Sequence, residues 1–415
     1  MKRLLAITAA ILILNTLAFA AGDYGTPGEF LNWGAGARAL GMGRAFTGLA
    51  DDVSAIYYNP AGLAQQNPFQ VSLMHVTLFY DTMYDFAATS YPVSGIGTFG
   101  AAYIRLGSTN FDGRDILANP TGNNQSVTEQ AAMLCYARDI FSNLSAGINL
   151  KLVNEDIFNT SGIGFGADLG FLYTPNEYVN LGLDFMNLAP ASIKLVDQAE
   201  ILPLTIKAGI ALKLLGERII PVVDVQKEMD DKQVKFLFGI EGYPAQFLAL
   251  RIGMDETEQL TVGAGINFMK YYKIDYSFAS EALGYSNRLS ITMAFGGFDV
   301  NLAADPKIFS PVGIKKTTTI SIYAMTKYDI TEWELDIINE DGDVVRTYSG
   351  EDKPPTSVMW DGKDDRGLPV SDGEYVCQMK VKDKNGKEIK SNDEKIKISS
   401  ALPIQPGTLE IQQEQ

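Results

Sequence analysis

The feature that most constrains this chain is an alternation of apolar with small or polar residues, repeated between Phe69 and Phe298. Alternation with a period of two is typical of a β-strand whose two faces have different surroundings. Runs of about ten residues fit strands tilted across a membrane, whereas strands of soluble sandwiches usually have about five or six. The pattern predicts an all-β transmembrane antiparallel barrel over residues 69–298, with a soluble sandwich of two stacked sheets as the alternative. In one clear run the apolar positions are Leu144, Ala146, Ile148, Leu150 and Leu152.

We expect about fourteen strands, an even number, as single-chain bacterial barrels have. The last strand, NRLSITMAFGGF at 287–298, is expected to close against the first and leave no unpaired edge in lipid. Every other connection is short, and the intervening ones are longer, notably 108–126, 154–161 and 188–202. Since short turns are periplasmic in such barrels, we expect both ends of the barrel to face the periplasm. An aromatic girdle is expected on that side at Tyr173, Tyr178, Tyr243, Phe247, Tyr271 and Tyr272.

The N-terminus predicts export. Lys2 and Arg3 precede an apolar run that ends at a small-x-small site, Ala18-Phe19-Ala20, so residues 1–20 are interpreted as a signal peptide rather than a membrane anchor. The mature chain contains no run of the ~20 apolar residues that a membrane helix needs. The net charge of −16 argues against nucleic acid and anionic membrane surfaces as partners.

Residues 21–68 are too rich in glycine and too irregular for a membrane strand, and a barrel of this size needs water or a plug in its lumen. We therefore predict an N-terminal hatch. The runs Gly36–Gly43, Ala45–Asp52 and Asn59–Leu63 resemble the N-terminus of the PorV/PorQ group, relatives of the FadL long-chain fatty acid transporters. The resemblance covers about thirty residues and implies a FadL-like barrel, with Asn59, Pro60, Ala61 and Gly62 as hatch residues.

The Asn-Pro-Ala-Gly element is also compatible with a hatch on its own chemistry. Asn-Pro favours a turn and Gly62 permits a positive φ. The plainer interpretation is a tight turn that holds the plug, without contact to a ligand.

Charged residues at lumen-facing positions carry both signs, and we expect them either to line a pore or ligand site or to form ion pairs that hold the plug. The chain has a single histidine, His75, and no nucleotide-binding fingerprint, so we expect no enzyme, no metal and no cofactor. The lumen-facing candidates are Lys151, Asp184, Lys207, Asp224, Lys235, Glu241, Arg251, Lys273 and Asp275.

After the barrel we expect a linker at 299–312, a small β-sandwich at 313–400 and a flexible tail at 401–415. Short strands with Asp-Gly and Asn-Gly turns predict an immunoglobulin-like fold. The run Trp360–Tyr375 resembles the FlgD-type immunoglobulin-like domain. Its acidic cluster favours a solvated turn over a Ca²⁺ site, and Cys135 and Cys377 are expected to stay unpaired. The motif residues are Trp360, Asp361, Gly362, Asp364, Gly367, Gly373 and Tyr375.

Two functions are compatible with these features. The PorV/PorQ resemblance implies an outer-membrane protein that assists type IX-type protein export or surface attachment, with secretion-system components or exported proteins as partners. The alternative is a FadL-like transporter of hydrophobic compounds. A structural anchor between the outer membrane and the periplasm also stays open. In each case we expect outer-membrane lipid around the barrel and a periplasmic C-terminal domain with contacts there.

Overall fold

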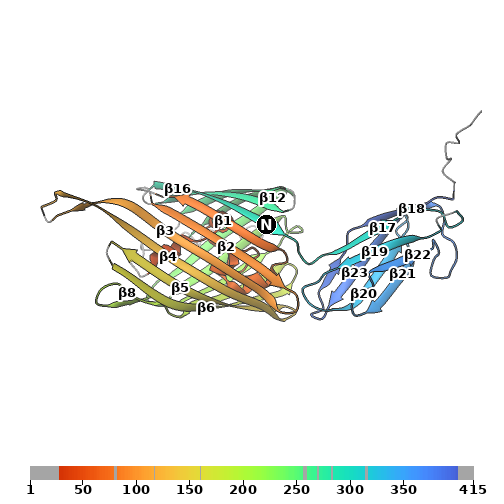
Figure 1. Ribbon diagram of the computed structural model, residues 1–415, viewed down its shortest axis with the longest axis horizontal. Helices are drawn as coiled ribbons and strands as arrows, with labels where there is room; N and C mark the ends of the chain where they lie inside the picture. The colour runs from red at the N-terminus through yellow and green to blue at the C-terminus, as the bar shows by residue number, and fades with distance from the viewer. Residues whose placement is uncertain are drawn as a thin grey trace, which may run out of the picture. The chain divides into compact units, whose positions relative to one another are not determined.

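Figure 1 shows the computed structural model of the chain. It describes residues 28–78, 82–115, 117–158, 160–255, 259–268, 271–281, 284–313 and 316–400. The predicted signal peptide at 1–20 and the predicted tail at 401–415 lie outside these residues. The described part forms two compact units, the barrel with its hatch and the C-terminal domain.

Fourteen antiparallel strands of the described residues close into one barrel. The first and last strands pair from Phe69↔Phe295 to Thr77↔Asn287, so the expected closure and strand number are confirmed. The alternative of two stacked sheets is wrong for this region. The strands are β1 (Phe69–Thr77), β2 (Met83–Val93), β3 (Gly97–Arg114), β4 (Pro120–Phe141), β5 (Leu144–Ile157), β6 (Thr160–Asn176), β7 (Val179–Ala189), β10 (Thr205–Leu212), β11 (Ile219–Glu228), β12 (Val234–Ala245), β13 (Leu248–Met254), β14 (Leu260–Phe268), β15 (Tyr272–Glu281) and β16 (Gly284–Phe295).

The alternation in sequence becomes an apolar outer wall and a lumen wall. Leu150 is 57% exposed, whereas its neighbour Lys151 is 3% exposed. Large apolar side chains face outward on strands all around the barrel, which suits lipid and not water. Tyr243 departs from the predicted girdle. It follows Glu241 by two positions, faces the lumen like Glu241, and packs against the hatch.

The segment from Gly28 to Gln66 lies inside the barrel and contains no strand. It forms short helical turns, because its glycines and small residues allow tight packing without a continuous amphipathic face. The elements are η1 (Glu29–Trp33), α2 (Ala37–Leu40), α3 (Ala55–Tyr58) and η2 (Pro60–Gln65).

The connections differ from prediction at the end of the barrel opposite Phe69 and Phe295, which we name the distal end. The predicted loops 108–126 and 154–161 are mostly strand, since β3 with β4 and β5 with β6 continue pairing almost to their turns. The β3–β4 hairpin extends beyond its neighbours (Figure 1). Strand pairing satisfies the hydrogen bonds of backbone N–H and C=O groups outside the membrane as well as within it. Only 188–202 remains a long connection, and it contains the hairpin β8 (Ser192–Lys194) and β9 (Ala199–Ile201).

The C-terminal unit is a β-domain of two main sheets, ordered β17-β19-β22 and β18-β25-β23-β20-β21. The predicted linker at 299–312 is wrong, because β17 pairs with β19 along its whole length and Val300, Leu302 and Ala304 enter the core. Their alternation is the signal that the prediction overlooked. The strands are β17 (Val300–Asp305), β18 (Ile308–Phe309), β19 (Thr318–Ala324), β20 (Ile330–Ile338), β21 (Val344–Glu351), β22 (Ser357–Trp360), β23 (Gly373–Asp383), β24 (Glu388–Lys390) and β25 (Glu394–Ile398).

Within the described residues, no helix is both long enough and apolar enough to span a bilayer.

Candidate functional site: the hatch and the lumen wall

Glycines on the lumen face of the barrel let the hatch backbone approach the wall. A Cβ on Gly239 would lie 2.5 Å from the carbonyl oxygen of Met42, and one on Gly147 would lie 2.5 Å from the backbone nitrogen of Ala61. Such separations are too short for any side chain, so only glycine allows this docking. Further lumen-facing glycines that meet hatch atoms in the same way are Gly170, Gly182, Gly209 and Gly253.

The Asn59-Pro60-Ala61-Gly62 motif joins the hatch to itself and to the wall. The Asn59 amide donates to the carbonyl oxygens of Thr47 and Phe171, each at 3.0 Å, and its Oδ1 accepts from Ala61 N at 3.1 Å. Pro60 opens η2, where it needs no amide hydrogen. Gly62 does not use a positive φ, contrary to expectation. It is required because a Cβ there would collide with Ala50.

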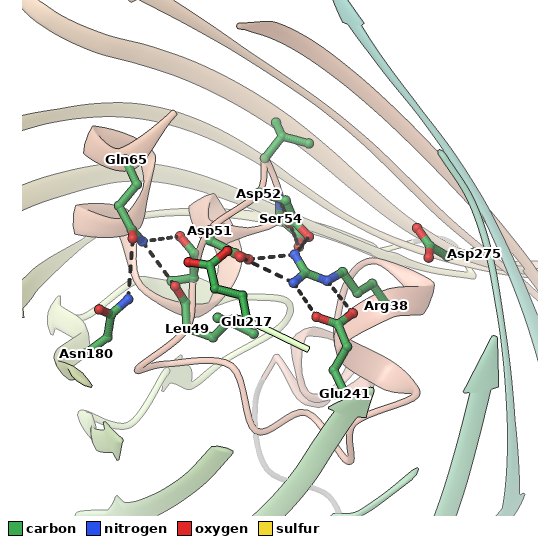
Figure 2. Close-up of polar contacts among 12 residues, drawn as sticks. Arg38, Leu49, Asp51, Asp52, Ser54, Gln65, Asn180, Glu217, Glu241 and Asp275 are labelled. Atoms are coloured by element: carbon green, nitrogen blue, oxygen red, sulfur yellow. Dashed lines mark hydrogen bonds and ion pairs between the residues drawn. The ribbon is translucent and has the colours of Figure 1, made fainter. Parts of the chain in front are cut away.

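Arg38 forms the centre of a buried ionic network (Figure 2). Its guanidinium binds Glu241 of β12 at 2.6 Å and the hatch residues Asp51 and Asp52 at 2.6 and 3.0 Å. Glu241 also accepts from Arg251 Nε at 2.7 Å. A buried carboxylate flanked by two guanidinium groups is compensated in charge, and removal of either guanidinium leaves buried negative charge with one partner fewer. This network fastens α2 and the following hatch loop to β12 and β13.

A second polar contact joins the hatch to β11, the neighbour of β12. Asp224 Oδ2 accepts from the backbone nitrogens of Phe46 and Thr47 at 2.8 and 2.7 Å. Lys151 binds Asp168 at 2.7 Å and donates to the amide oxygen of Asn187 at 2.6 Å. Charge-assisted bonds are directional, so the Asp224 contacts fix the hatch against the wall, whereas the Lys151 contacts join wall strands to one another.

The nine charged candidates are all on lumen-facing positions, but only some contact the hatch. Glu241 and Asp224 bind it directly, and Lys207 lies 6.0 Å from the Tyr57 ring. The remaining candidates lie on the wall. Lys235, for example, pairs with Glu228 and Asp231. Sequence reasoning omitted Arg38 from this set, although an arginine among small and apolar residues of the hatch was the available signal. The other wall candidates are Lys151, Asp184, Arg251, Lys273 and Asp275.

On strands β1 to β4 part of the lumen wall is formed by large apolar side chains, although polar residues such as Gln70, Ser72 and Thr98 also face inward there. These apolar side chains are buried against the aromatic and aliphatic residues of the hatch in one continuous core. Porin lumens are polar, so this part of the wall is unusual for a barrel interior. We name it the apolar lumen wall, and its residues are Met74, Val76, Tyr84, Phe86, Ile104 and Met133, packed against Phe30, Leu31, Leu40, Tyr57 and Tyr58 of the hatch.

The motif residues of the C-terminal domain pack its core and form its turns. Trp360 is fully buried and packs edge-on against Phe309 and Tyr375, with ring centroids 5.5 and 5.2 Å away. Gly362 and Gly367 have φ values of 72° and 79°, which residues with a Cβ atom rarely adopt.

The acidic residues of this motif serve turns and surface pairs. Asp364 Oδ1 accepts from the backbone nitrogens of Arg366 and Leu368, and Asp361 pairs with Lys363 at 3.2 Å. Gly373 begins β23. Among the described residues no group of three His, Cys, Asp or Glu side chains is arranged to hold a metal ion.

These features define the class as a membrane-spanning β-barrel closed by an internal N-terminal hatch, joined to a C-terminal β-domain. Residues 310–386 match the family model of the FlgD Ig-like domain. None of the curated proteins compared with the chain matches it.

Among solved structures, the chain is similar to the Ralstonia pickettii toluene transporter TbuX, with 14% identity, 63% of this chain and 99% of that chain covered, and a TM-score of 0.47. It is also similar to the Pseudomonas putida toluene transporter TodX, with 13% identity, 63% and 96% covered, and a TM-score of 0.46. The values for a Pseudomonas aeruginosa FadL homologue are 12% identity, 62% and 98% covered, and a TM-score of 0.43.

Proposed function

We propose that this barrel lies in a bacterial outer membrane and lets small hydrophobic molecules pass along the apolar lumen wall, with the hatch as the gate. The observation that carries the proposal is the apolar lumen wall itself. A polar solute gains nothing from Met74, Phe86 and Ile104 inside the lumen, whereas a nonpolar solute is stabilised by about 25 cal/mol for each Å² that leaves water.

The two sides of the hatch differ in a way that suits gating. Its contacts with β12 and β11 are hydrogen bonds and ion pairs of defined geometry. Its contacts with the apolar lumen wall are non-directional apart from one hydrogen bond, in which the Tyr84 hydroxyl donates to the Gly34 carbonyl oxygen at 2.9 Å. A hydrophobic solute can replace the apolar contacts at little cost, so the hatch can separate from this wall with the loss of that hydrogen bond while Arg38 stays bound to Glu241.

The second candidate is the export function implied by the PorV/PorQ resemblance. The glycine contacts and the Arg38 network favour a hatch that stays in place. In that case the barrel is a fixed support, and its distal loops and C-terminal domain bind exported proteins or secretion components. With an even strand number and a periplasmic N-terminus, the C-terminal domain would lie in the periplasm.

A cross-linked hatch separates the two functions. Ala37 N donates to Ser290 Oγ at 3.1 Å, which brings the two residues close enough for a disulfide between Ala37→Cys and Ser290→Cys in a Cys135→Ser background. We expect oxidation to reduce uptake of the hydrophobic dye N-phenylnaphthylamine to the level of cells without the protein, and a reductant to restore it.

The control is the single variant Ala37→Cys, which should take up dye under both conditions. Uptake that is unchanged in a fully cross-linked protein would show that the hatch does not gate a passage. The export function predicts instead that surface display of secreted proteins survives cross-linking and is lost when residues 299–400 are deleted.

A further inference from the structure

An ionisable pair faces outward on β1 and β2. His75 and Asp85 are cross-strand partners, with His75 Nδ1 2.6 Å from Asp85 Oδ1 and their side chains 56% and 41% exposed. Thr77 Oγ1 lies 3.3 Å from His75 Nε2. The outer wall of the barrel is in contact with lipid, where ionisable side chains are rare and usually functional.

The depth of the pair follows from β16, the neighbour of β1. Tyr285 and Phe295 both face outward, with exposures of 71% and 43%. A tilted strand advances about 2.5 Å per residue along the membrane normal, so these two rings are about 25 Å apart, the height of the apolar band of such barrels. Leu289 lies between them and is the cross-strand partner of His75. The His75–Asp85 pair is therefore within the apolar band.

A groove of about 310 Å³ adjoins the pair on the same outer face. It exists because Ala87 on β2 is short, while Leu73 on β1 and Tyr103 on β3 project on either side. The volume is at the low end of the roughly 300–1,000 Å³ found for ligand pockets. Apart from the ionisable pair, the groove is lined by Leu73, Met74, Phe86, Ala87, Tyr103, Leu289 and Ile291.

The hydrogen bonding of the pair selects the headgroup. A carboxylate only accepts hydrogen bonds, so His75 Nδ1 donates to Asp85 Oδ1, and the Thr77 hydroxyl lies against His75 Nε2. Among the described residues no donor to Asp85 Oδ2 is present. In a medium of low dielectric constant such an anion is stabilised by a cationic donor.

We propose that this groove binds a phospholipid with a primary ammonium headgroup. The ammonium donates to Asp85, and one acyl chain lies along Leu289 and Ile291. Thr77 and Asn287 face each other across β1 and β16 and continue the polar surface toward Tyr285, so that a headgroup reaches the pair with local thinning of the bilayer. The site is independent of any passage through the lumen.

The test uses the full-length protein in detergent and native mass spectrometry with added lipids of identical acyl chains. Phosphatidylethanolamine has a primary ammonium, whereas phosphatidylcholine has a cation without N–H donors. Loss of a charge-assisted hydrogen bond is expected to weaken binding about tenfold, so phosphatidylethanolamine adducts should form at about one tenth of the concentration that phosphatidylcholine needs.

Three variants complete the test. Asp85→Asn should abolish the preference, and Asp156→Asn, which alters an exposed carboxylate on β5, should keep it. Ala87→Leu fills the groove on a face already in contact with lipid, so it should fold and lose adducts of both lipids, which decides the matter if Asp85→Asn does not fold. Equal binding of the two lipids, a preference for phosphatidylglycerol, or full binding by Ala87→Leu would overturn the proposal.

Discussion

Replacing Gly239 by alanine tests whether close backbone contact holds the hatch. The added Cβ would lie 2.5 Å from the carbonyl oxygen of Met42 and 2.8 Å from its Cβ. Neither atom belongs to the flexible end of a side chain, so the hatch must move. Overpacking of this kind costs about 1–3 kcal/mol, which shifts the balance between docked and displaced hatch about 5- to 150-fold toward the displaced state.

The matched control is Gly242→Ala, three positions along the same strand. Its Cβ would meet no atom closer than 4.0 Å. We expect single-channel recordings in planar bilayers to show openings in Gly239→Ala far more often than in the wild type, with Gly242→Ala unchanged. The protease sensitivity of the hatch should follow the same order. If the two variants have the same open probability, backbone contact at Gly239 does not hold the hatch, and the reasoning from the glycine positions is wrong.

Three further predictions concern charge and burial. Arg38→Gln leaves Glu241 with one buried partner fewer and should destabilise hatch docking by about 3–5 kcal/mol. Single-channel recordings measure this effect. As a control, Lys213→Gln, which removes an exposed pair, should have no effect. In the C-terminal domain, burial alone would raise the pKa of Glu394, but the Ala304 N–H and Lys307 hold this pKa below its ordinary value. The ionised Glu394 side chain therefore stabilises the folded domain fully above the ordinary glutamate pKa of about 4.3. This stabilisation is lost as pH falls through the lower pKa of the folded state. In a Trp33→Phe background, in which Trp333 and Trp360 report on this domain, the difference in urea stability between wild type and Glu394→Gln should shrink on acidification; a constant difference would contradict the assignment. Burial raises the pKa of the Cys377 thiol to about 12, and Cys135 is also buried and unpaired, so a thiol reagent at pH 8 should label neither cysteine until the chain is unfolded; labelling of the native protein would show that one of them is accessible.

Much of the barrel could be predicted from local pattern alone. A period of two places Leu150 and Lys151 on opposite faces whatever the strands pair with, because successive side chains of a strand point in opposite directions. The same rule placed all nine charged candidates on the lumen wall. The pairing of the first strand with the last could also be predicted, because a barrel in lipid cannot leave a strand edge unpaired.

Local pattern was less informative where pairing partners decide the outcome. Residues 108–126 contain turn-forming and polar residues, yet most of them are strand because β3 and β4 satisfy each other's backbone beyond the membrane. Residues 299–312 contain two prolines, yet β17 becomes strand because β19 supplies its partner.

The sequence by itself determined that this chain forms a barrel with an apolar exterior, a hatch of small residues and a separate β-domain. Each of these properties depends on residue type at fixed local spacing. Only the tertiary structure decided which residues meet. Arg38 reaches Glu241 across 203 positions, the lumen glycines face Met42 and Ala61, and His75 and Asp85 share one groove. Such contacts depend on the register of strands around a closed barrel, and a periodicity of two excludes a slip by one residue but not a slip by two.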